Sequence, residues 1–151
     1  MDAARIKEYL LDTQKRELPL IIKRELKTDD TPKIKSIIGP RRAGKTYYLF
    51  QKMSELRESI AKEQMIYLNF EDPRLIGITF LEIYEIIKLH WQLFPQTLEK
   101  KLLIFIDEPQ NVAQWEIGVR ALYDNHFEIY LTGSSSKLLS KEIATNLRGR
   151  T

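Results

Sequence analysis

Residues 39–46 read Gly-Pro-Arg-Arg-Ala-Gly-Lys-Thr, which has the spacing G-x-x-x-x-G-K-T. The apolar residues Ile34, Ile37 and Ile38 precede them, and residues 47–56, which can form a helix, follow. This context matters because a phosphate-binding loop forms where a buried strand turns into a helix whose free backbone N–H groups point at an anion. The alternative is a turn containing glycine and proline that opens an ordinary basic helix. Spacing and context together favour a phosphate-binding loop.

The residue types within this loop suit nucleotide phosphates and Mg²⁺. Glycines at both ends let the backbone approach phosphate oxygens and adopt dihedral angles that a side chain would forbid. Lys45 can place a positive charge between the β- and γ-phosphates, and the Thr46 hydroxyl can ligate Mg²⁺. We therefore predict a nucleotide site formed by the whole loop, which comprises Gly39, Pro40, Arg41, Arg42, Ala43, Gly44, Lys45 and Thr46.

A second chemical feature is a pair of acids at the end of an apolar run. Residues 102–106 read Leu-Leu-Ile-Phe-Ile, as expected of a strand buried on both faces of a parallel sheet, and Asp107 and Glu108 follow. A carboxylate at the end of such a strand can hold a metal ion, and an adjacent one can orient water for attack. Because Pro109 disfavours the helical conformation at the preceding residue, we expect strand geometry to continue through Glu108. The alternative is two acids that end a strand in solvent, but beside a phosphate-binding loop we interpret Asp107 as a metal-site residue.

Apolar residues at helical spacing predict helices in three parts of the chain. These parts are residues 2–27, with a break at Pro19, residues 79–94 and residues 115–126. The second of them begins with a capping box, because Thr79 and Glu82 stand three residues apart. We interpret His90, within that helix, as a surface or packing residue. Residues 28–33 are polar and contain a proline, so we expect a loop that leads into the first strand.

Runs of strand-forming residues predict two further strands, one at 65–70 and one within 128–136 that runs into a small polar loop. In doubly wound sheets, ligands bind beyond the carboxyl ends of the strands, so Thr132 or Ser134 can hydrogen-bond the γ-phosphate or the attacking water. A serine-rich N-cap of a helix over residues 137–147 would explain either hydroxyl equally well. The order of the elements predicts an α/β fold with a mainly parallel sheet.

Composition limits the remaining possibilities. The 151 residues are 43% hydrophobic, which excludes a wholly disordered chain, and the absence of cysteine excludes disulfides and thiolate metal sites. Lys and Arg exceed Asp and Glu by 24 − 21 = 3, which is too small an excess to indicate nucleic-acid binding. The N-terminus lacks the apolar segment of a signal peptide, and no run is long enough to cross a bilayer, so we expect a cytoplasmic protein without a membrane partner.

Five motifs together resemble the prokaryotic AAA-type ATP-binding family, within the P-loop ATPases that carry a catalytic glutamate. They are Gly-Pro-Arg-Arg-Ala-Gly-Lys-Thr (39–46), Tyr-Leu-Asn-Phe-Glu-Asp (67–72), Asp-Glu-Pro-Gln-Asn (107–111) followed by Trp115, Tyr-Leu-Thr-Gly-Ser-Ser (130–135) and Leu-Arg-Gly-Arg (147–150). The resemblance implies a three-layer α-β-α sandwich with the sheet order 5-1-4-3-2. It also implies that Asp107 is the Walker B carboxylate, that Glu108 polarises water and that Thr132 or Ser134 is the sensor residue.

The resemblance further implies Mg²⁺-dependent ATP binding and ATP hydrolysis, with Lys45 and Glu108 as catalytic residues. Arg148 and Arg150 are candidate arginine fingers, which in this family commonly act across a subunit boundary of a homo-oligomer. The alternatives are a switch or scaffold that binds nucleotide without hydrolysing it, a P-loop kinase, and a motor or defence component linked to nucleic acid. The preference for ATP over GTP follows from the resemblance alone.

The chain departs from the family pattern in two places and in its length. Pro109 stands where these proteins have an aliphatic residue, and two tyrosines, Tyr47 and Tyr48, follow Thr46. Members of the family continue after the Arg-Gly-Arg segment with a fifth strand, a helical lid region and a further domain. By that comparison we expect a helical lead-in over residues 1–33, packed on an incomplete ATPase core over residues 34–151 in which the fifth strand is missing.

Overall fold

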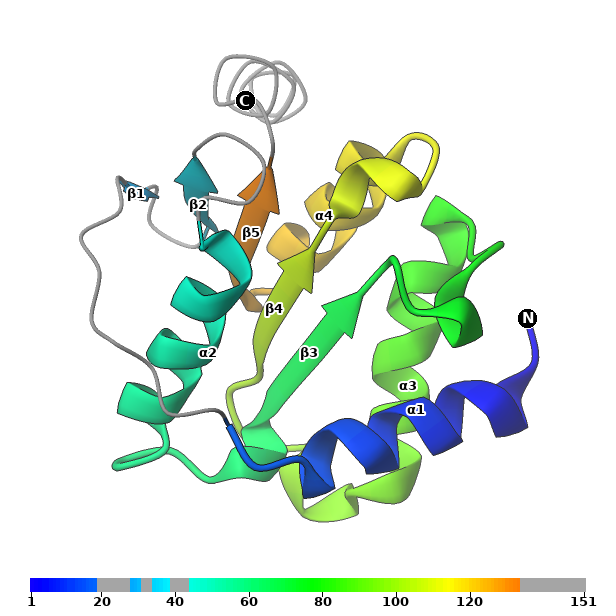
Figure 1. The fold of residues 1–151 in the computed structure, drawn as a ribbon. Helices are drawn as coiled ribbons and strands as arrows, with labels where there is room; N and C mark the ends of the chain where they lie inside the picture. Colours follow the sequence, from blue (N-terminus) through cyan, green and yellow to red (C-terminus); the bar gives the residue numbers. More distant parts are fainter. Residues whose placement is uncertain (19–27, 31–33, 39–43, 134–151) are drawn as a thin grey trace.

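The computed structural model describes residues 1–18, 28–30, 34–38 and 44–133. Within them, one sheet has the strand order β1-β2-β5-β4-β3 (Figure 1). Its strands are β1 (Thr28–Asp30), β2 (Ile34–Ile38), β3 (Met65–Asn69), β4 (Leu103–Asp107) and β5 (Glu128–Gly133). The neighbours β2, β5, β4 and β3 run parallel, whereas β1 pairs antiparallel with β2. The predicted α/β fold with a mainly parallel sheet is confirmed.

The strand order tests the order implied by the family resemblance. The sequence β2-β5-β4-β3 corresponds to 1-4-3-2, and β1 occupies the place beside β2 that the resemblance gives to a fifth strand. The predicted loop over residues 28–33 is therefore wrong for Thr28–Asp30. The reason is that an edge strand is held by backbone hydrogen bonds and needs no buried side chains, so its polar residues carry no strand pattern.

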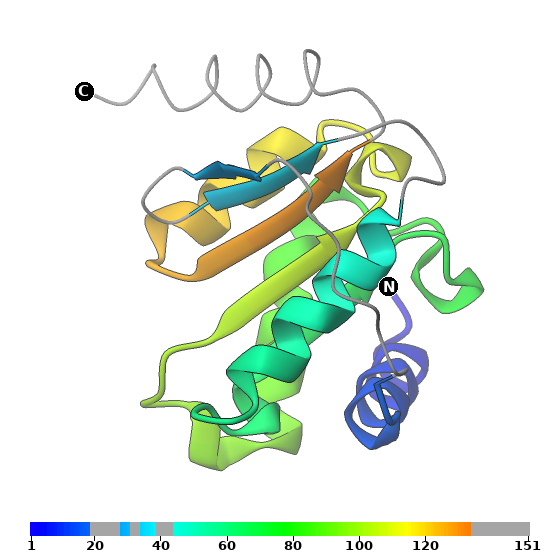
Figure 2. The same ribbon diagram turned by 60° about the vertical axis from the view of Figure 1, so that its left-hand side comes forward.

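Helices cover both faces of the sheet, as Figures 1 and 2 show. On one face lies α2 (Lys45–Leu56), whose Leu49, Phe50 and Met53 form an apolar core with side chains of β3, β4 and β5. On the other face lie α3 (Ile83–Leu93) and α4 (Trp115–Asp124). All five residues of β4 are buried, as its continuous apolar run predicts.

Local signals in the sequence set the bounds of these helices. Before α3, Thr79 and Glu82 form the predicted capping box around a short 3₁₀ turn, Phe80–Glu82, and the helix ends before Pro95. His90 on α3 is fully buried, and its Nε2 lies 2.7 Å from the Glu63 carbonyl oxygen, which confirms its interpretation as a packing residue. In the described part of the chain, no helix combines the length and the apolar character needed to cross a membrane.

Helix α1 (Ala3–Lys15) lies along the outer edge of β3 and satisfies its backbone groups with side chains (Figure 1). The Tyr9 hydroxyl donates to the Tyr67 carbonyl at 2.6 Å and accepts from the Asn69 N–H at 2.9 Å. The Gln14 amide donates to the Met65 carbonyl at 2.7 Å. Burial raises the pKa of Tyr9 well above its ordinary value. We call Tyr9 and Gln14 the edge pair; they protect an edge that would otherwise be open to a second strand.

Candidate active site

The site begins at the amino end of α2. Gly44, the N-cap residue, has φ 82° and ψ 20°, which is the left-handed region and bears out the prediction that this position needs glycine. Lys45 follows with only 5% of its surface exposed, and Thr46 is partly exposed. The first turn of a helix carries backbone N–H groups without partners inside the helix and a partial positive charge, so this turn favours an anion.

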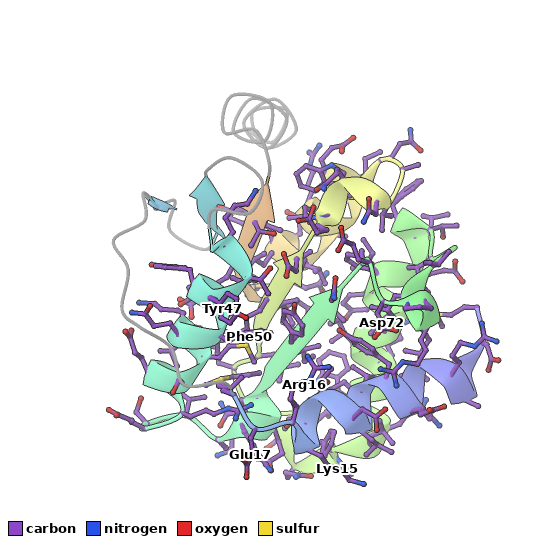
Figure 3. All side chains as sticks on the ribbon, viewed as in Figure 1. Lys15, Arg16, Glu17, Tyr47, Phe50 and Asp72 are labelled. Carbon is purple, nitrogen blue, oxygen red and sulfur yellow. The ribbon has the colours of Figure 1, made fainter. Side chains whose placement is uncertain are left out.

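The carboxyl ends of three strands supply the other half of the site. Side chains alternate along a strand, and Tyr67, Asp107 and Thr132 all lie on the face of the sheet that α2 covers. They come from the neighbouring strands β3, β4 and β5 respectively. Figure 3 shows Phe50 projecting from α2 toward β3, where its ring packs 5.1 Å from that of Tyr67. The fold thus brings the start of α2 next to these strand ends.

Asp107 is the centre of the arrangement and is 3% exposed. Its Oδ2 accepts from the Thr46 hydroxyl at 2.7 Å and from the Tyr67 hydroxyl at 2.9 Å. Its Oδ1 accepts from the Thr132 hydroxyl at 2.7 Å. Both carboxyl oxygens therefore accept hydrogen bonds from hydroxyl groups. We call these four residues, Thr46, Tyr67, Asp107 and Thr132, the Asp107 cluster.

Glu108 lies beside the cluster but not in the conformation that the sequence predicts. It has φ 55° and ψ 53°, in the left-handed region, so the expected continuation of strand geometry is wrong. The turn lets its N–H donate to the Thr132 hydroxyl at 3.1 Å, and its carbonyl accepts from the Asn111 N–H at 3.2 Å. These bonds offset a conformation that costs a residue with a side chain about 1 kcal/mol. The Glu108 carboxylate accepts a hydrogen bond from the Gln110 amide.

Tyr67 is the member of the cluster that the sequence reasoning did not assign to the site. Burial, followed by the charge of Asp107, raises the pKa of Tyr67 well above its ordinary value. The phenol therefore keeps its proton and donates a hydrogen bond to the carboxylate. The signal that could have found it is its position, because a tyrosine two residues before the end of β3 is long enough to reach the end of the adjacent strand.

Thr46 and Asp107 are the residues that could hold a magnesium ion. Two neighbouring ligands of octahedral Mg²⁺, each about 2.05 Å from the ion, lie roughly 2.9 Å apart. The oxygens of Thr46 and Asp107 are 2.7 Å apart, so a small movement would make them neighbouring ligands. A single carboxylate with a hydroxyl is also the typical protein share of a Mg²⁺ site that water and substrate phosphates complete.

The structure thus brings together six of the residues that the sequence predicts for the site. They are Gly44, Lys45, Thr46, Asp107, Glu108 and Thr132. The other predicted residues lie outside the described part of the chain, and these are Gly39, Pro40, Arg41, Arg42, Ala43, Ser134, Arg148 and Arg150.

Comparisons with known proteins find uncharacterized relatives. Over 131 residues, or 86% of its length, the chain is 47% identical to the uncharacterized protein MJ1544 of Methanocaldococcus jannaschii, of which it covers 28%. It is 38% identical over 123 residues to an uncharacterized protein of Haemophilus influenzae, which corresponds to 80% of this chain and 30% of that protein. The chain therefore spans less than a third of the length of these curated relatives. No solved structure matches it.

A family model gives the assignment to a family that these uncharacterized relatives do not supply. The model described as "AAA domain" matches residues 31–151, which include the residues before α2, the Asp107 cluster and the whole sheet from β2 onward. Members of this family are nucleotide-binding proteins. The chain therefore belongs to the AAA domain family.

Proposed function

We propose that this chain is a Mg²⁺-dependent ATP-binding domain and that it hydrolyses ATP. The observation that carries the proposal is the 2.7 Å hydrogen bond between the Thr46 hydroxyl and Asp107. It joins the start of a helix, where phosphate binds, to the end of a buried strand, where an acid can hold a metal ion.

In this proposal the residues at the start of α2 bind the triphosphate. Lys45 would place its charge between the β- and γ-phosphates, and backbone N–H groups within residues 39–46, of which Pro40 has none, would donate to phosphate oxygens. Thr46 and Asp107 would hold Mg²⁺, which when bound neutralises charge on the β- and γ-phosphates. The carboxylate is already oriented by its neighbours in the Asp107 cluster, so little reorganisation is needed at that position.

The acid beside the cluster supplies the chemistry. Glu108 polarises a water molecule whose oxygen attacks the γ-phosphorus in line with the leaving oxygen. A bond forms between that oxygen and phosphorus, and the bond between the γ-phosphorus and the bridging oxygen breaks. ADP leaves with that bond's electron pair, and Glu108 accepts the proton of the water. The sensor residue in this proposal is Thr132, whose hydroxyl links Asp107 Oδ1 to the backbone N–H of Glu108.

An arginine from a second copy is part of the proposal. Arginine stabilises charge in the transition state of this class of reaction, and its removal costs on the order of a thousandfold in rate. Arg148 and Arg150 are the candidates for this role, with Arg41 and Arg42 as possible helpers. If the arginine acts in trans, turnover per chain rises with protein concentration as copies associate. Fast turnover that does not depend on concentration contradicts this part of the proposal.

Calorimetric titration tests the proposal directly. The chain is titrated with ATP, GTP and ADP, each with and without Mg²⁺, and compared with Lys45→Ala. We expect tight binding of ATP with Mg²⁺ and a loss of that binding in Lys45→Ala. Equal binding by the two proteins would overturn the proposed site.

A switch that binds nucleotide without hydrolysing it is the second candidate. The observation that favours it is the hydrogen bond from Gln110 to the Glu108 carboxylate, which occupies part of the group that would polarise water. Phosphate release distinguishes the two functions, because a switch shows the same slow release with Glu108 as with Glu108→Gln. A role linked to nucleic acid would appear as DNA binding that weakens steeply as salt rises.

A further inference from the structure

Tyr67 touches the proposed metal-binding carboxylate but has no direct task in the proposed chemistry. Its hydroxyl lies 2.9 Å from Asp107 Oδ2, the same oxygen that accepts from Thr46. The side chain is 5% exposed, so it is part of the interior and not of the ligand-facing surface. A buried phenol that donates a hydrogen bond to a buried carboxylate can have one of two roles. It supplies only the hydrogen bond that the buried oxygen needs, or it also fixes the orientation of the carboxylate for a ligand.

The surroundings of Tyr67 hold its hydroxyl in one place. The ring packs against Phe50 of α2, with 5.1 Å between the centroids, and its backbone is paired with Phe105 of β4 in the sheet. A tyrosine side chain has two rotatable bonds, so a clamped ring and a clamped backbone define where its hydroxyl lies. This position therefore does not depend on a bound nucleotide.

The Asp107 carboxylate is consequently held at both oxygens by the two strands that flank it. Thr132 of β5 binds Oδ1, and Tyr67 of β3 binds Oδ2. Two anchors on opposite oxygens prevent rotation of the carboxylate group, which keeps Oδ2 directed at Thr46 on α2. Outer hydrogen-bond partners of metal-binding carboxylates act in this way, and their loss typically lowers metal affinity about 10- to 100-fold.

We infer that Tyr67 is a positioning residue for the metal site: its hydroxyl holds Asp107 in the orientation that binds a divalent cation together with the nucleotide. The inference rests on the proposed function, since it assigns a task within the same site. Tyr67 itself does not contact the ion or the phosphates. Its effect passes through the carboxylate of Asp107.

Tyr9 provides a matched control. Like Tyr67, it is a buried tyrosine with a hydrogen-bonded hydroxyl. The Tyr9 hydroxyl bonds to backbone groups of β3, whereas the Tyr67 hydroxyl bonds to Asp107. Tyr9→Phe and Tyr67→Phe therefore remove the same atom from two buried positions. A general loosening of the fold would affect both variants, whereas a positioning role would affect only Tyr67→Phe.

The test uses Mn²⁺ as the probe, measured as the loss of free Mn²⁺ signal by electron paramagnetic resonance at saturating ADP. ADP affinity in the presence of EDTA is measured for each protein, because metal-free binding reports the folded, nucleotide-competent fraction. We expect Tyr67→Phe to bind Mn²⁺ at least about 10-fold more weakly than the unaltered chain. We expect its metal-free ADP affinity to stay within about twofold, and Tyr9→Phe to match the unaltered chain in both measurements.

Each other outcome overturns a defined statement. Unchanged Mn²⁺ affinity in Tyr67→Phe overturns the positioning role and leaves the proposed function intact. Equal weakening in both variants, or a loss of metal-free ADP binding that accounts for the whole effect, also overturns it. If the unaltered chain binds neither ADP nor Mn²⁺, that result overturns both the proposed function and the positioning role of Tyr67.

Discussion

The Asp107 cluster and the edge pair are two buried polar regions that meet at Tyr67, and they differ in charge. In the edge pair, neutral side chains of α1 satisfy neutral backbone groups of β3. In the cluster, hydroxyl groups surround a carboxylate that is 3% exposed. Burying a charge costs folding free energy, whereas satisfying a buried backbone group stabilises the fold. Under the proposed function, the edge pair stabilises the fold and the cluster holds a ligand.

The largest expected effect follows from Glu108→Gln, which keeps the shape of the side chain but removes its charge. We predict that ATP turnover falls about a thousandfold while ATP binding is unchanged, because only the proton acceptor is lost. Phosphate release at saturating ATP measures the first quantity, and calorimetry the second. If release continues at its original rate, Glu108 is not the group that accepts the proton.

Asp107→Asn is expected to have the next largest effect, and it tests the Asp107 cluster directly. We predict that Mn²⁺ affinity at saturating ADP falls about a hundredfold, because the metal-binding carboxylate is lost. The free energy of unfolding should change less than in Tyr9→Phe, since the lost hydrogen bonds are offset by removal of a buried charge. Urea unfolding of both variants measures this. A larger loss of stability in Asp107→Asn would show that the cluster is primarily structural.

Tyr9→Phe tests the neutral region. It leaves the Asn69 N–H and the Tyr67 carbonyl without their partner, so we predict a loss of about 2 kcal/mol in the free energy of unfolding. For a chain of this size that corresponds to a decrease of roughly 4–8 °C in Tm. Tyr84→Phe, which keeps its ring contacts with Trp91 and Phe127, serves as the control and should change Tm little. A Tm of Tyr9→Phe equal to that of the control would remove the stabilising role of the edge pair.

His90 gives the smallest effect and extends the comparison to a third buried polar group. Burial lowers the pKa of His90 below 6.5, so in acid the unfolded chain takes up a proton that the folded chain does not. Stability from this group is therefore present above about pH 6.5 and is lost as the pH falls below it, by at most about 1.4 kcal/mol per pH unit. Unfolding curves between pH 7.5 and 5.5 should show that the free energy of unfolding falls less steeply in His90→Gln than in the unaltered chain. Parallel curves would mean that His90 does not contribute to the pH dependence.

Much of the fold was predictable because its signals are local. The strand at 65–69, the buried strand that ends at Asp107 and the helix after the Thr79–Glu82 capping box lie where the apolar spacing and the capping residues predict them. The site was predictable to the extent that it depends on motif spacing, which correctly paired Thr46 with Asp107 and placed Thr132 beside them. The backbone of Glu108 was not, because the pre-proline preference was overridden by its hydrogen bond to Thr132.

The amino-acid order alone determined the G-x-x-x-x-G-K-T spacing at residues 39–46, the strand and helix periods and the acids at the end of β4, because backbone dihedral preferences, capping and burial patterns act over a few residues. Tertiary structure decided which of these features meet. Tyr67 reaches Asp107 across 40 positions of the chain, Tyr9 reaches Tyr67 across 58, and β1 joins the sheet through backbone groups that every residue possesses. Such contacts depend on which strands become neighbours in the folded sheet, and the residues involved look ordinary in the sequence until that packing is known.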